Sequence, residues 1–415
     1  MRSIRLDRRY ILLLLVLLAL TVRSCGLGHI KKHTGDESMH ISNAMSYVET
    51  GVITSNWSHP PLRHILQYCS IKILGDNPYG WRGVNVLFGT LSILIIFLLA
   101  KELFDNERVA ALSSIFLLID PLHIMFSRTT FEEIPGGFFI MAAVYSALRY
   151  LRGSTLAALA AGLCFGLSFA TKWYYLPAWV VVTCFIIYRR YAQGNLGTSE
   201  AMYVFAAFFI LPAAVYLSTF HFWFARGYGM GDFLSMQADS FKMLEGLNFD
   251  VYETQNIRML AVPVWQWFLK PVVIGYNIWI MGAFSLSVVF MNSPIVWLLT
   301  IPSVTFVTFK SIMGTNANKG LMILLFAFTY AQFCIINRPM FFYSLLSVLP
   351  FAYLCIALFL SWIIETHTKN TWHFRALIVL SAVLGIYLLP LAVVMPYPTF
   401  LYKPVFAFSN MVSSF

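Results

Sequence analysis

Hydrophobic side chains occur along this chain in long runs that are separated by short polar segments. A membrane-spanning helix needs about 20 mostly apolar residues, and a window of that length finds about eleven such runs. We therefore expect an all-α polytopic membrane protein. The predicted spans are roughly 10–26, 82–100, 108–126, 133–150, 155–171, 174–189, 201–222, 294–310, 320–336, 341–363 and 375–395.

Two of the intervening segments are long, at about 27–80 and about 223–293. Unusually long loops tend to carry function. The first loop contains "ESMHISNAMSYVETG" and "HPPLRHILQYCSIKILG", and we expect each to form a helix in the membrane interface. We expect no separate soluble domain, so that residues 1–415 form one membrane domain.

The stretch 261–291 lies in the second long loop and is also apolar. It is interrupted by residues that disfavour a continuous helix, among them Pro263, Lys270 and Pro271, and its β-branched residues cluster. We interpret this stretch as a re-entrant or interfacial loop rather than a span.

The composition supports a membrane protein. Of the 415 residues, 59% are hydrophobic and only 11% are charged. A soluble domain has about a quarter of its residues charged, so this chain cannot cover a water-facing surface. The net charge of +10 does not indicate nucleic-acid binding, because the basic residues are scattered among the hydrophobic runs.

The distribution of charge predicts the orientation. The first apolar run follows a basic stretch without a clean cleavage site, so we expect it to be retained as the first helix. Lys and Arg are denser in the short loops on the side of the N-terminus, which places the N-terminus in the cytoplasm. Both long loops then lie on the outer side.

Ionisable residues of both signs recur at the outer ends of the predicted spans, in segments that are far apart in the sequence. Such residues are costly at the edge of a membrane and usually pair or line a site. We therefore predict one polar cavity at the outer interface. Its candidate residues are Asp36, Glu37, Arg128, Glu132, Glu133, Lys172, Lys270, Arg338 and Tyr343.

These residue types favour chemistry on a phosphorylated lipid. A carboxylate can act as general base on a hydroxyl, and Arg or Lys can hold a phosphate. No nucleotide-binding or hydrolase motif occurs in a suitable context. No cofactor is indicated with confidence, and a divalent metal stays open because several acids and histidines lie on the same side. We expect His33 and His40 to be ordinary loop residues.

The ordered set of motifs resembles the polyprenyl-phosphate-sugar-dependent glycosyltransferases of the GT-C fold, and within them the protein O-mannosyltransferase family most closely. The set begins with an Asp-Glu pair after the first span, "HPPL", "SRTTFEE" and "TKW". It continues with "VPVWQWFLKP", "MNSPIVWLL" and "NRPMFFYSLLSVLPF", and it covers nearly the whole chain.

The resemblance implies an inverting glycosyltransferase that takes a sugar from a polyprenyl or dolichyl phosphate. Asp36 would be the catalytic base, and Glu37 would support it or contact the acceptor. The acceptor would be a hydroxyl on protein Ser/Thr, on a lipid or on a glycan, at the outer cell-membrane face or in the ER lumen. The substrate-binding residues would be His59, Arg128, Glu132, Glu133, Lys172, Trp265, Lys270, Arg338 and Tyr343.

Some positions depart from the family pattern. Glu133 stands where the family usually has Asp, and Lys270 with Pro271 replaces Arg-Pro. These departures leave the sugar and the acceptor open, including aminoarabinose transfer to lipid A. A lipid-linked sugar transporter or flippase is a second class of function, and an inactive structural subunit is a third. A transporter predicts charges near the bilayer midplane and an inverted repeat, whereas the charges here gather at one face.

Overall fold

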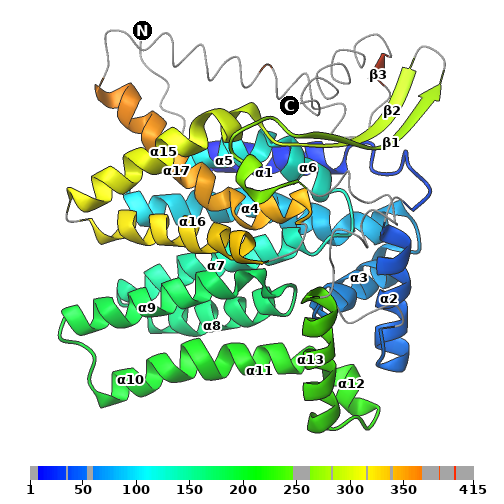
Figure 1. Ribbon diagram of the computed structural model, residues 1–415, viewed down its shortest axis with the longest axis horizontal. Coiled ribbons are helices and arrows are strands. Elements are labelled where there is room, and N and C mark those ends of the chain that lie inside the picture. The colour runs from blue at the N-terminus through cyan, green and yellow to red at the C-terminus, as the bar shows by residue number, and fades with distance from the viewer. Residues whose placement is uncertain are drawn as a thin grey trace.

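The computed structural model is a bundle of long helices with a second group of shorter helices across one end (Figure 1). It describes residues 8–33, 36–53, 59–245, 262–281, 284–314, 316–336, 340–366, 383 and 397–398. The bundle helices are α1 (Arg8–Ser24), α4 (Pro78–Phe104), α5 (Glu107–Ile119), α7 (Glu133–Leu151), α8 (Thr155–Phe169), α9 (Leu176–Ala192), α10 (Thr198–Phe205), α11 (Leu211–Ser218), α15 (Pro294–Ile312), α16 (Ala317–Ile335) and α17 (Leu349–Thr366).

Each predicted span before residue 375 coincides with a helix or with consecutive helical segments, and the span 375–395 lies outside the described residues. The predicted integral membrane protein is confirmed, whereas the number of eleven spans is not. Six helices of the described part are long and apolar enough to cross a bilayer: Pro78–Phe104, Glu133–Leu151, Thr198–Ser218, Pro294–Ile312, Ala317–Ile335 and Leu349–Thr366. Tyr10–Ser24 and Thr155–Phe169 are shorter apolar helices.

The predicted span 108–126 is broken into two helices. Helix α5 ends at Ile119, and α6 (Pro121–Phe126) begins after Asp120. Asp120 accepts a hydrogen bond from the backbone N–H of His123, and Pro121 cannot donate the bond that would continue α5. The break lets the chain turn toward the loop that carries Glu132.

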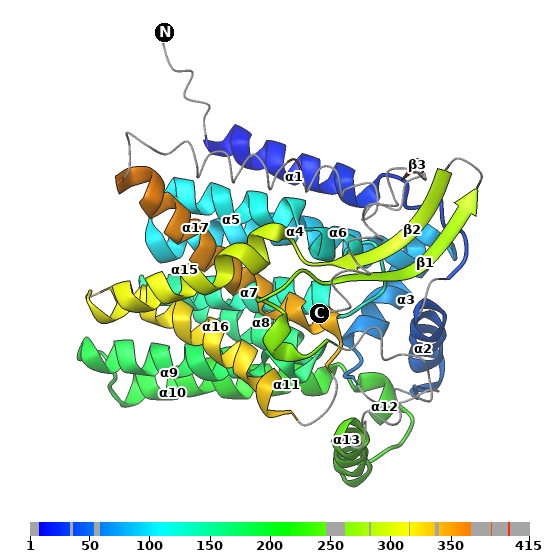
Figure 2. The ribbon, with the colours of Figure 1, turned by 45° about the horizontal axis from the view of Figure 1, so that its top comes forward.

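Four shorter helices lie at one end of the bundle: α2 (Glu37–Thr50), α3 (Leu62–Leu74), α12 (His221–Ala225) and α13 (Met230–Glu245). Figures 1 and 2 show α2 and α13 running across the direction of the long helices at this end. The two helices that we predicted in the first loop, α2 and α3, are confirmed as helices. The long loops therefore build a layer over the ends of the bundle helices.

The second loop contains a β-hairpin, which the expectation of an all-helical chain did not include. Strands β1 (Val273–Met281) and β2 (Phe284–Met291) pair antiparallel, with Val273 opposite Met291, and β3 (Tyr397–Pro398) adds to β2. The hairpin occupies most of 261–291, so this stretch is not a membrane-spanning helix, as predicted. Its β-branched residues favour strands over a helix.

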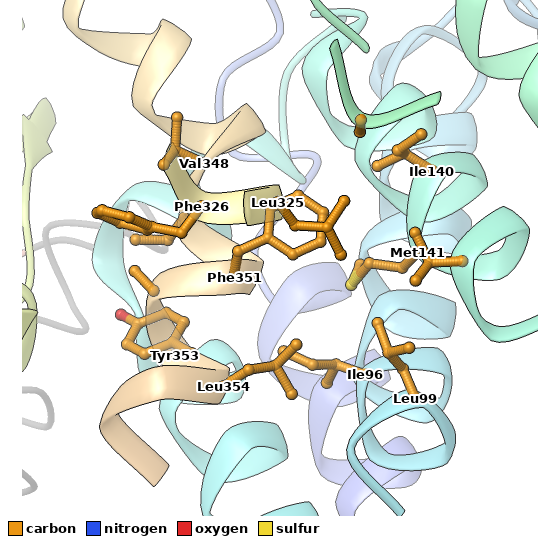
Figure 3. Close-up of a cluster of buried hydrophobic side chains, with 14 of the residues drawn as sticks. Ile96, Leu99, Ile140, Met141, Leu325, Phe326, Val348, Phe351, Tyr353 and Leu354 are labelled. Atoms are coloured by element: carbon orange, nitrogen blue, oxygen red, sulfur yellow. The ribbon is translucent and has the colours of Figure 1, made fainter. Parts of the chain in front are cut away.

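The hydrophobic core lies where helices from both halves of the chain meet. Figure 3 shows Ile96 and Leu99 of α4 near Met141 of α7, with Leu354 of α17 beside them. All four side chains are buried. This contact packs α4 and α7 against the C-terminal helix α17. Helices α4 and α7 also carry parts of the candidate site, so the packed core supports the site.

Candidate active site

Glu132 is the centre of a group of charged side chains at the end of the bundle covered by α3. Its Oε1 lies 3.0 Å from Lys172 Nζ and 3.1 Å from His59 Nε2. Its Oε2 lies 3.3 Å from Arg63 Nε. The next residue, Glu133, places its Oε1 2.5 Å from the same Lys172 Nζ. We call these five residues the charge cluster. All are buried except His59, whose side chain is 25% exposed.

Three separate turns supply the charge cluster. His59 and Arg63 flank the Pro-Pro start of α3, Glu132 and Glu133 begin α7, and Lys172 follows α8. A hydrogen bond from the backbone N–H of Leu62 to the carbonyl of Ala170, at 3.0 Å, joins the first turn to the third. The site is therefore held by backbone contacts between turns and not only by its own ion pairs.

The two ionic partners at the centre stabilise each other's charge. Burial alone would raise the pKa of Glu132, but Lys172, His59 and Arg63 hold it well below its usual value. Burial alone would lower the pKa of Lys172, but Glu132 and Glu133 hold it above its usual value. Lys172 also lies 4.7 Å from the ring centre of Tyr174 and 5.3 Å from that of Tyr343. Its ammonium group is thus surrounded by protein groups.

Asp36 differs from the other carboxylates because it stays exposed. It is the residue before the first turn of α2, and its side chain does not cap that helix. Partial burial of the carboxyl and the nearby charge of Glu132 raise its pKa, while Arg63 acts in the opposite direction. Within the described part of the chain, no ion pair is formed by Asp36. Its carboxylate is available to a ligand beside the charge cluster.

Glu37 has a different environment from its neighbour. Its side chain is fully buried, and both of its oxygens accept hydrogen bonds from Arg82 of α4, at 2.9 and 2.8 Å. The remaining N–H groups of Arg82 donate to the backbone carbonyls of Leu27, Ile30 and Lys32. The predicted direct catalytic role of Glu37 gains no support from this geometry, which makes it an anchor for the segment that carries Asp36.

Arg128 is also an anchor. Its NH1 donates to the carbonyls of Arg23 and Cys25, both at 2.7 Å, and it lies 3.3 Å from that of Val22. These carbonyls belong to the end of α1 and the turn after it, where a helix leaves unpaired acceptors. These contacts tie Arg128 to the end of α1 and give no support to the predicted contact with a substrate.

Tyr343 meets the charge cluster, whereas other residues predicted from the second half of the chain do not. The Tyr343 ring packs 5.1 Å from Phe131 and lies over Lys172. Trp265 is 62% exposed, and among the described residues no ion pair joins Lys270 to the cluster. Arg338 lies outside the described residues.

Sequence reasoning missed three residues of this site. Arg63 enters the charge cluster, His64 Nε2 lies 3.2 Å from Arg63, and His40 Nδ1 lies 2.8 Å from Thr130 Oγ1. Burial, reinforced by the positive charge of Arg63, holds the pKa of both histidines well below the usual value. The expectation that His40 is an ordinary loop residue was wrong, since its ring is buried against the Glu132 loop. The one available signal was the placement of Arg63 directly after "HPPL".

Two apolar cavities are lined in part by Trp173, the residue that follows Lys172 of the charge cluster. Their volumes are about 410 and 510 Å³, and Trp173 lines both. The first is lined also by Tyr174, Phe241, Leu244, Glu245, Gln332, Ile335 and Ile336. The second is lined by Phe169, Leu176, Trp179, Phe209, Pro212, Ala213, Tyr216, Leu217, Phe233 and Gln237.

The divalent metal left open by the sequence finds no ready ligand set. In the parts of the chain that the structure describes, no three His, Cys, Asp or Glu side chains gather as a metal site. Glu132 is instead surrounded by Lys172, His59 and Arg63.

The sequence is similar to those of protein mannosyltransferases. Residues 58–219, which include the whole charge cluster, match the family model described as dolichyl-phosphate-mannose-protein mannosyltransferase. A polyprenol-phosphate-mannose–protein mannosyltransferase of Corynebacterium glutamicum is 26% identical over 46% of this chain and 45% of its own length. One of the same name from Mycolicibacterium smegmatis (strain mc(2)155) is 22% identical over 75% of this chain and 72% of its own length. The aligned region thus spans less than half of the Corynebacterium relative.

Solved structures share the architecture. The chain superimposes on the S. cerevisiae protein O-mannosyltransferase Pmt1-Pmt2 complex bound to the sugar donor with a TM-score of 0.80 and 13% identity, over 97% of this chain and 92% of that one. It superimposes on ArnT from Cupriavidus metallidurans bound to undecaprenyl phosphate with a TM-score of 0.63 and 14% identity, over 91% and 64%. The predicted GT-C fold and the predicted resemblance to protein O-mannosyltransferases are confirmed.

Proposed function

We propose that this GT-C membrane protein, similar to the protein mannosyltransferases, is an inverting glycosyltransferase that uses a polyprenyl- or dolichyl-phosphate-linked sugar. The sugar is mannose or another hexose, and the acceptor is a hydroxyl on protein Ser/Thr. The reaction takes place on the outer face of the membrane, within one membrane domain that extends over residues 1–415. One observation carries the proposal: Asp36 is exposed beside a buried charge cluster and forms no ion pair with any other residue that the structure describes.

Three of the four carboxylates near the site are paired with cations. Glu37 is engaged by Arg82, and Glu132 and Glu133 are engaged by Lys172. Asp36 alone among these four is available to take a proton from an acceptor hydroxyl. Its raised pKa makes it a stronger base than an ordinary aspartate.

The bond changes follow from this arrangement. The acceptor oxygen loses its proton to Asp36 and attacks C1 of the sugar. The bond between C1 and the phosphate oxygen breaks, and its electron pair leaves with the lipid phosphate. A phosphate is already a good leaving group, so positioned groups can supply the catalysis without a covalent intermediate. Attack opposite to the leaving group inverts the configuration at C1.

The apolar cavities support a donor with a hydrocarbon chain. Both are lined by Trp173, which directly follows Lys172 of the charge cluster, and the first is lined also by Tyr174. Burial of a hydrocarbon chain there is favourable by roughly 25 cal/mol per Å² of apolar surface. The isoprenoid part of the donor fits these cavities while its phosphate and sugar lie toward the cluster.

Mass spectrometry of products tests the proposal. Purified protein is incubated with a panel of polyprenyl-phosphate sugars and with peptide, lipid A and glycan acceptors. We expect transfer to a Ser/Thr peptide in the wild type and its loss in Asp36→Asn. The matched control is Asp232→Asn, which removes an exposed carboxylate on α13 that is not part of the charge cluster, and it should keep activity. Full transfer by Asp36→Asn would exclude Asp36 as the base, and transfer only to lipid A or glycan would replace the protein acceptor.

A further inference from the structure

Lys172, the cation of "TKW", is one of the residues that we expected to bind substrate. Its ammonium group is already engaged by other side chains of the protein. Its Nζ lies 3.0 Å from Glu132 and 2.5 Å from Glu133. The rings of Tyr174 and Tyr343 lie on its other sides. Two carboxylates and two rings already surround this ammonium group, so an incoming phosphate would gain little from Lys172. A phosphate at this place would need a second cation.

Arg63 is that cation. Its side chain is 4% exposed and lies in the first turn of α3, which the two preceding prolines and the Leu62–Ala170 backbone hydrogen bond fix in place. A guanidinium carries five N–H donors in a rigid fork. Arg63 donates one hydrogen bond to Gln67 Oε1 at 3.3 Å, and another of its N–H groups lies 3.2 Å from His64 Nε2. Among the residues that the structure describes, the N–H of Nε and one N–H on each terminal nitrogen make no hydrogen bond.

Arg63 contacts Glu132 through Nε as an ion pair that lacks hydrogen-bond geometry. Nε lies 3.3 Å from Glu132 Oε2, yet neither atom makes a hydrogen bond in the described part of the chain. Glu132 is already engaged through Oε1 by Lys172 and His59. A buried donor without a partner costs about 1–3 kcal/mol, which a ligand oxygen at this position would offset. The orphaned Nε–H of Arg63 therefore points to an anionic ligand.

We infer that Arg63 binds the phosphate of the lipid carrier with its free guanidinium N–H groups and stabilises the negative charge that develops as the sugar leaves. This inference rests on the proposed function. The planar fork of arginine matches two phosphate oxygens, which the point charge of a lysine does not. Burial lowers the pKa of Arg63, and Glu132 opposes that effect. A bound phosphate would further stabilise the positively charged form of Arg63, which burial disfavours.

Inhibitor binding tests this role without requiring turnover. The probes are a two-isoprene prenyl monophosphate and the prenyl alcohol of equal length, and their dissociation constants are measured on purified full-length protein. The variants are Arg63→Lys, which keeps the charge but loses the fork, and Arg63→Gln, which loses both. The matched control is Lys72→Gln, which removes an exposed cation two to three turns further along the same helix.

For the wild type and for Lys72→Gln we expect the phosphate to bind much more tightly than the alcohol. We expect Arg63→Lys and Arg63→Gln to weaken phosphate binding by roughly 10- to 100-fold, the loss of a charge-assisted contact, and to leave alcohol binding unchanged. A purely structural role would weaken both probes equally and would overturn the inference. Unchanged phosphate binding in both variants would overturn it as well.

The same measurement separates this inference from the proposed function. If wild-type protein does not prefer the phosphate over the alcohol, the lipid-phosphate donor is wrong and the role of Arg63 falls with it. If the wild type shows the preference and the Arg63 variants keep it, only the role of Arg63 is wrong. Arg63→Lys is the informative variant where Arg63→Gln fails to fold, because it keeps the charge opposite Glu132.

Discussion

At the scale of single residues, neighbours in the sequence have separate roles in this protein. Asp36 and Glu37 look like one acidic pair, but α2 begins at Glu37, and successive helical residues point about 100° apart. Glu37 therefore enters the core and meets Arg82, while Asp36 stays at the surface. The sequence could predict that carboxylates matter here. It could not predict which one is free, because the partner of Glu37 comes from another helix.

The raised pKa of Asp36 predicts the acid limb of the activity profile. A base works only when deprotonated, so activity falls as pH drops through the pKa, and a raised pKa moves that fall above the ordinary range of about 4. We expect kcat/KM to show this limb. Glu132→Gln removes a charge that raises the pKa of Asp36, so the limb of its residual activity should move to lower pH. A move to higher pH would contradict this electrostatic account.

The buried pair of Glu37 and Arg82 predicts a stability effect. Arg82→Met leaves a fully buried carboxylate without its cation, which costs about 3–5 kcal/mol. We expect a marked loss of thermal stability in detergent micelles. The double variant Glu37→Leu with Arg82→Met should lose less than the sum of the single variants, because no unpaired charge remains. Additive losses would show that the two side chains do not act as a pair.

At the scale of elements, the turn between α8 and α9 positions Lys172 through close contact with α7. A Cβ added at Gly136 would lie 2.3 Å from Tyr175 and 2.4 Å from Thr171, the two residues on either side of this part of the turn. We expect Gly136→Ala to displace the turn, to cost about 1–3 kcal/mol and to reduce transfer activity strongly. Thermal unfolding and initial rates measure the two effects.

The neighbouring glycine gives a matched control. A Cβ at Gly137 would have its nearest contact at 3.8 Å, with the Tyr175 hydroxyl, which is an ordinary van der Waals distance. Alanine is also favoured over glycine inside a helix by up to about 1 kcal/mol. Gly137→Ala should therefore keep activity and unfold at the same or a higher temperature. Equal damage by both substitutions would exclude the close contact as the cause.

Hydrophobic runs were enough to predict most helices, because a bilayer requires long apolar segments with internal hydrogen bonds. They were not enough to place the break at Pro121 or the hairpin Val273–Met291. These features depend on local backbone chemistry within an apolar stretch. The charge cluster was predicted in part: Glu132 and Lys172 were expected at one depth. Arg63 was missed, because its burial depends on packing between distant turns.

At the scale of the whole molecule, the layer of α2, α3 and α13 at one end predicts a two-sided labelling pattern. Lys72 of α3 belongs to this end, whereas Gln193 follows the opposite end of α9. In a cysteine-free background, we expect Lys72→Cys to react with a membrane-impermeant thiol reagent in intact cells. Gln193→Cys should react only after permeabilisation. The reverse pattern would place the N-terminus and the site on the other sides of the membrane.

The apolar cavities predict that binding of the proposed donor depends on the length of its isoprenoid chain. Trp173 lines both cavities, so Trp173→Ala removes a large contact for a long isoprenoid chain. We expect KM to rise about 10-fold or more for a long-chain donor and much less for a two-isoprene donor. The control Leu324→Ala, in a separate cavity between α9 and α16, should affect neither. An equal rise for both donors would mean that Trp173 acts near the sugar and not along the chain.

Arg82 and Arg128 hold the segment before Asp36 through backbone carbonyls, those of Leu27, Ile30 and Lys32 in one case and those around Arg23 in the other. A carbonyl is present whichever amino acid occupies a position. Mutations at exposed positions of this segment, such as Lys31 and Lys32, can therefore accumulate over evolution without moving Asp36. Insertions and deletions cannot, because they shift the carbonyls out of register. Among relatives that keep both arginines, the segment should diverge in composition while its length stays constant.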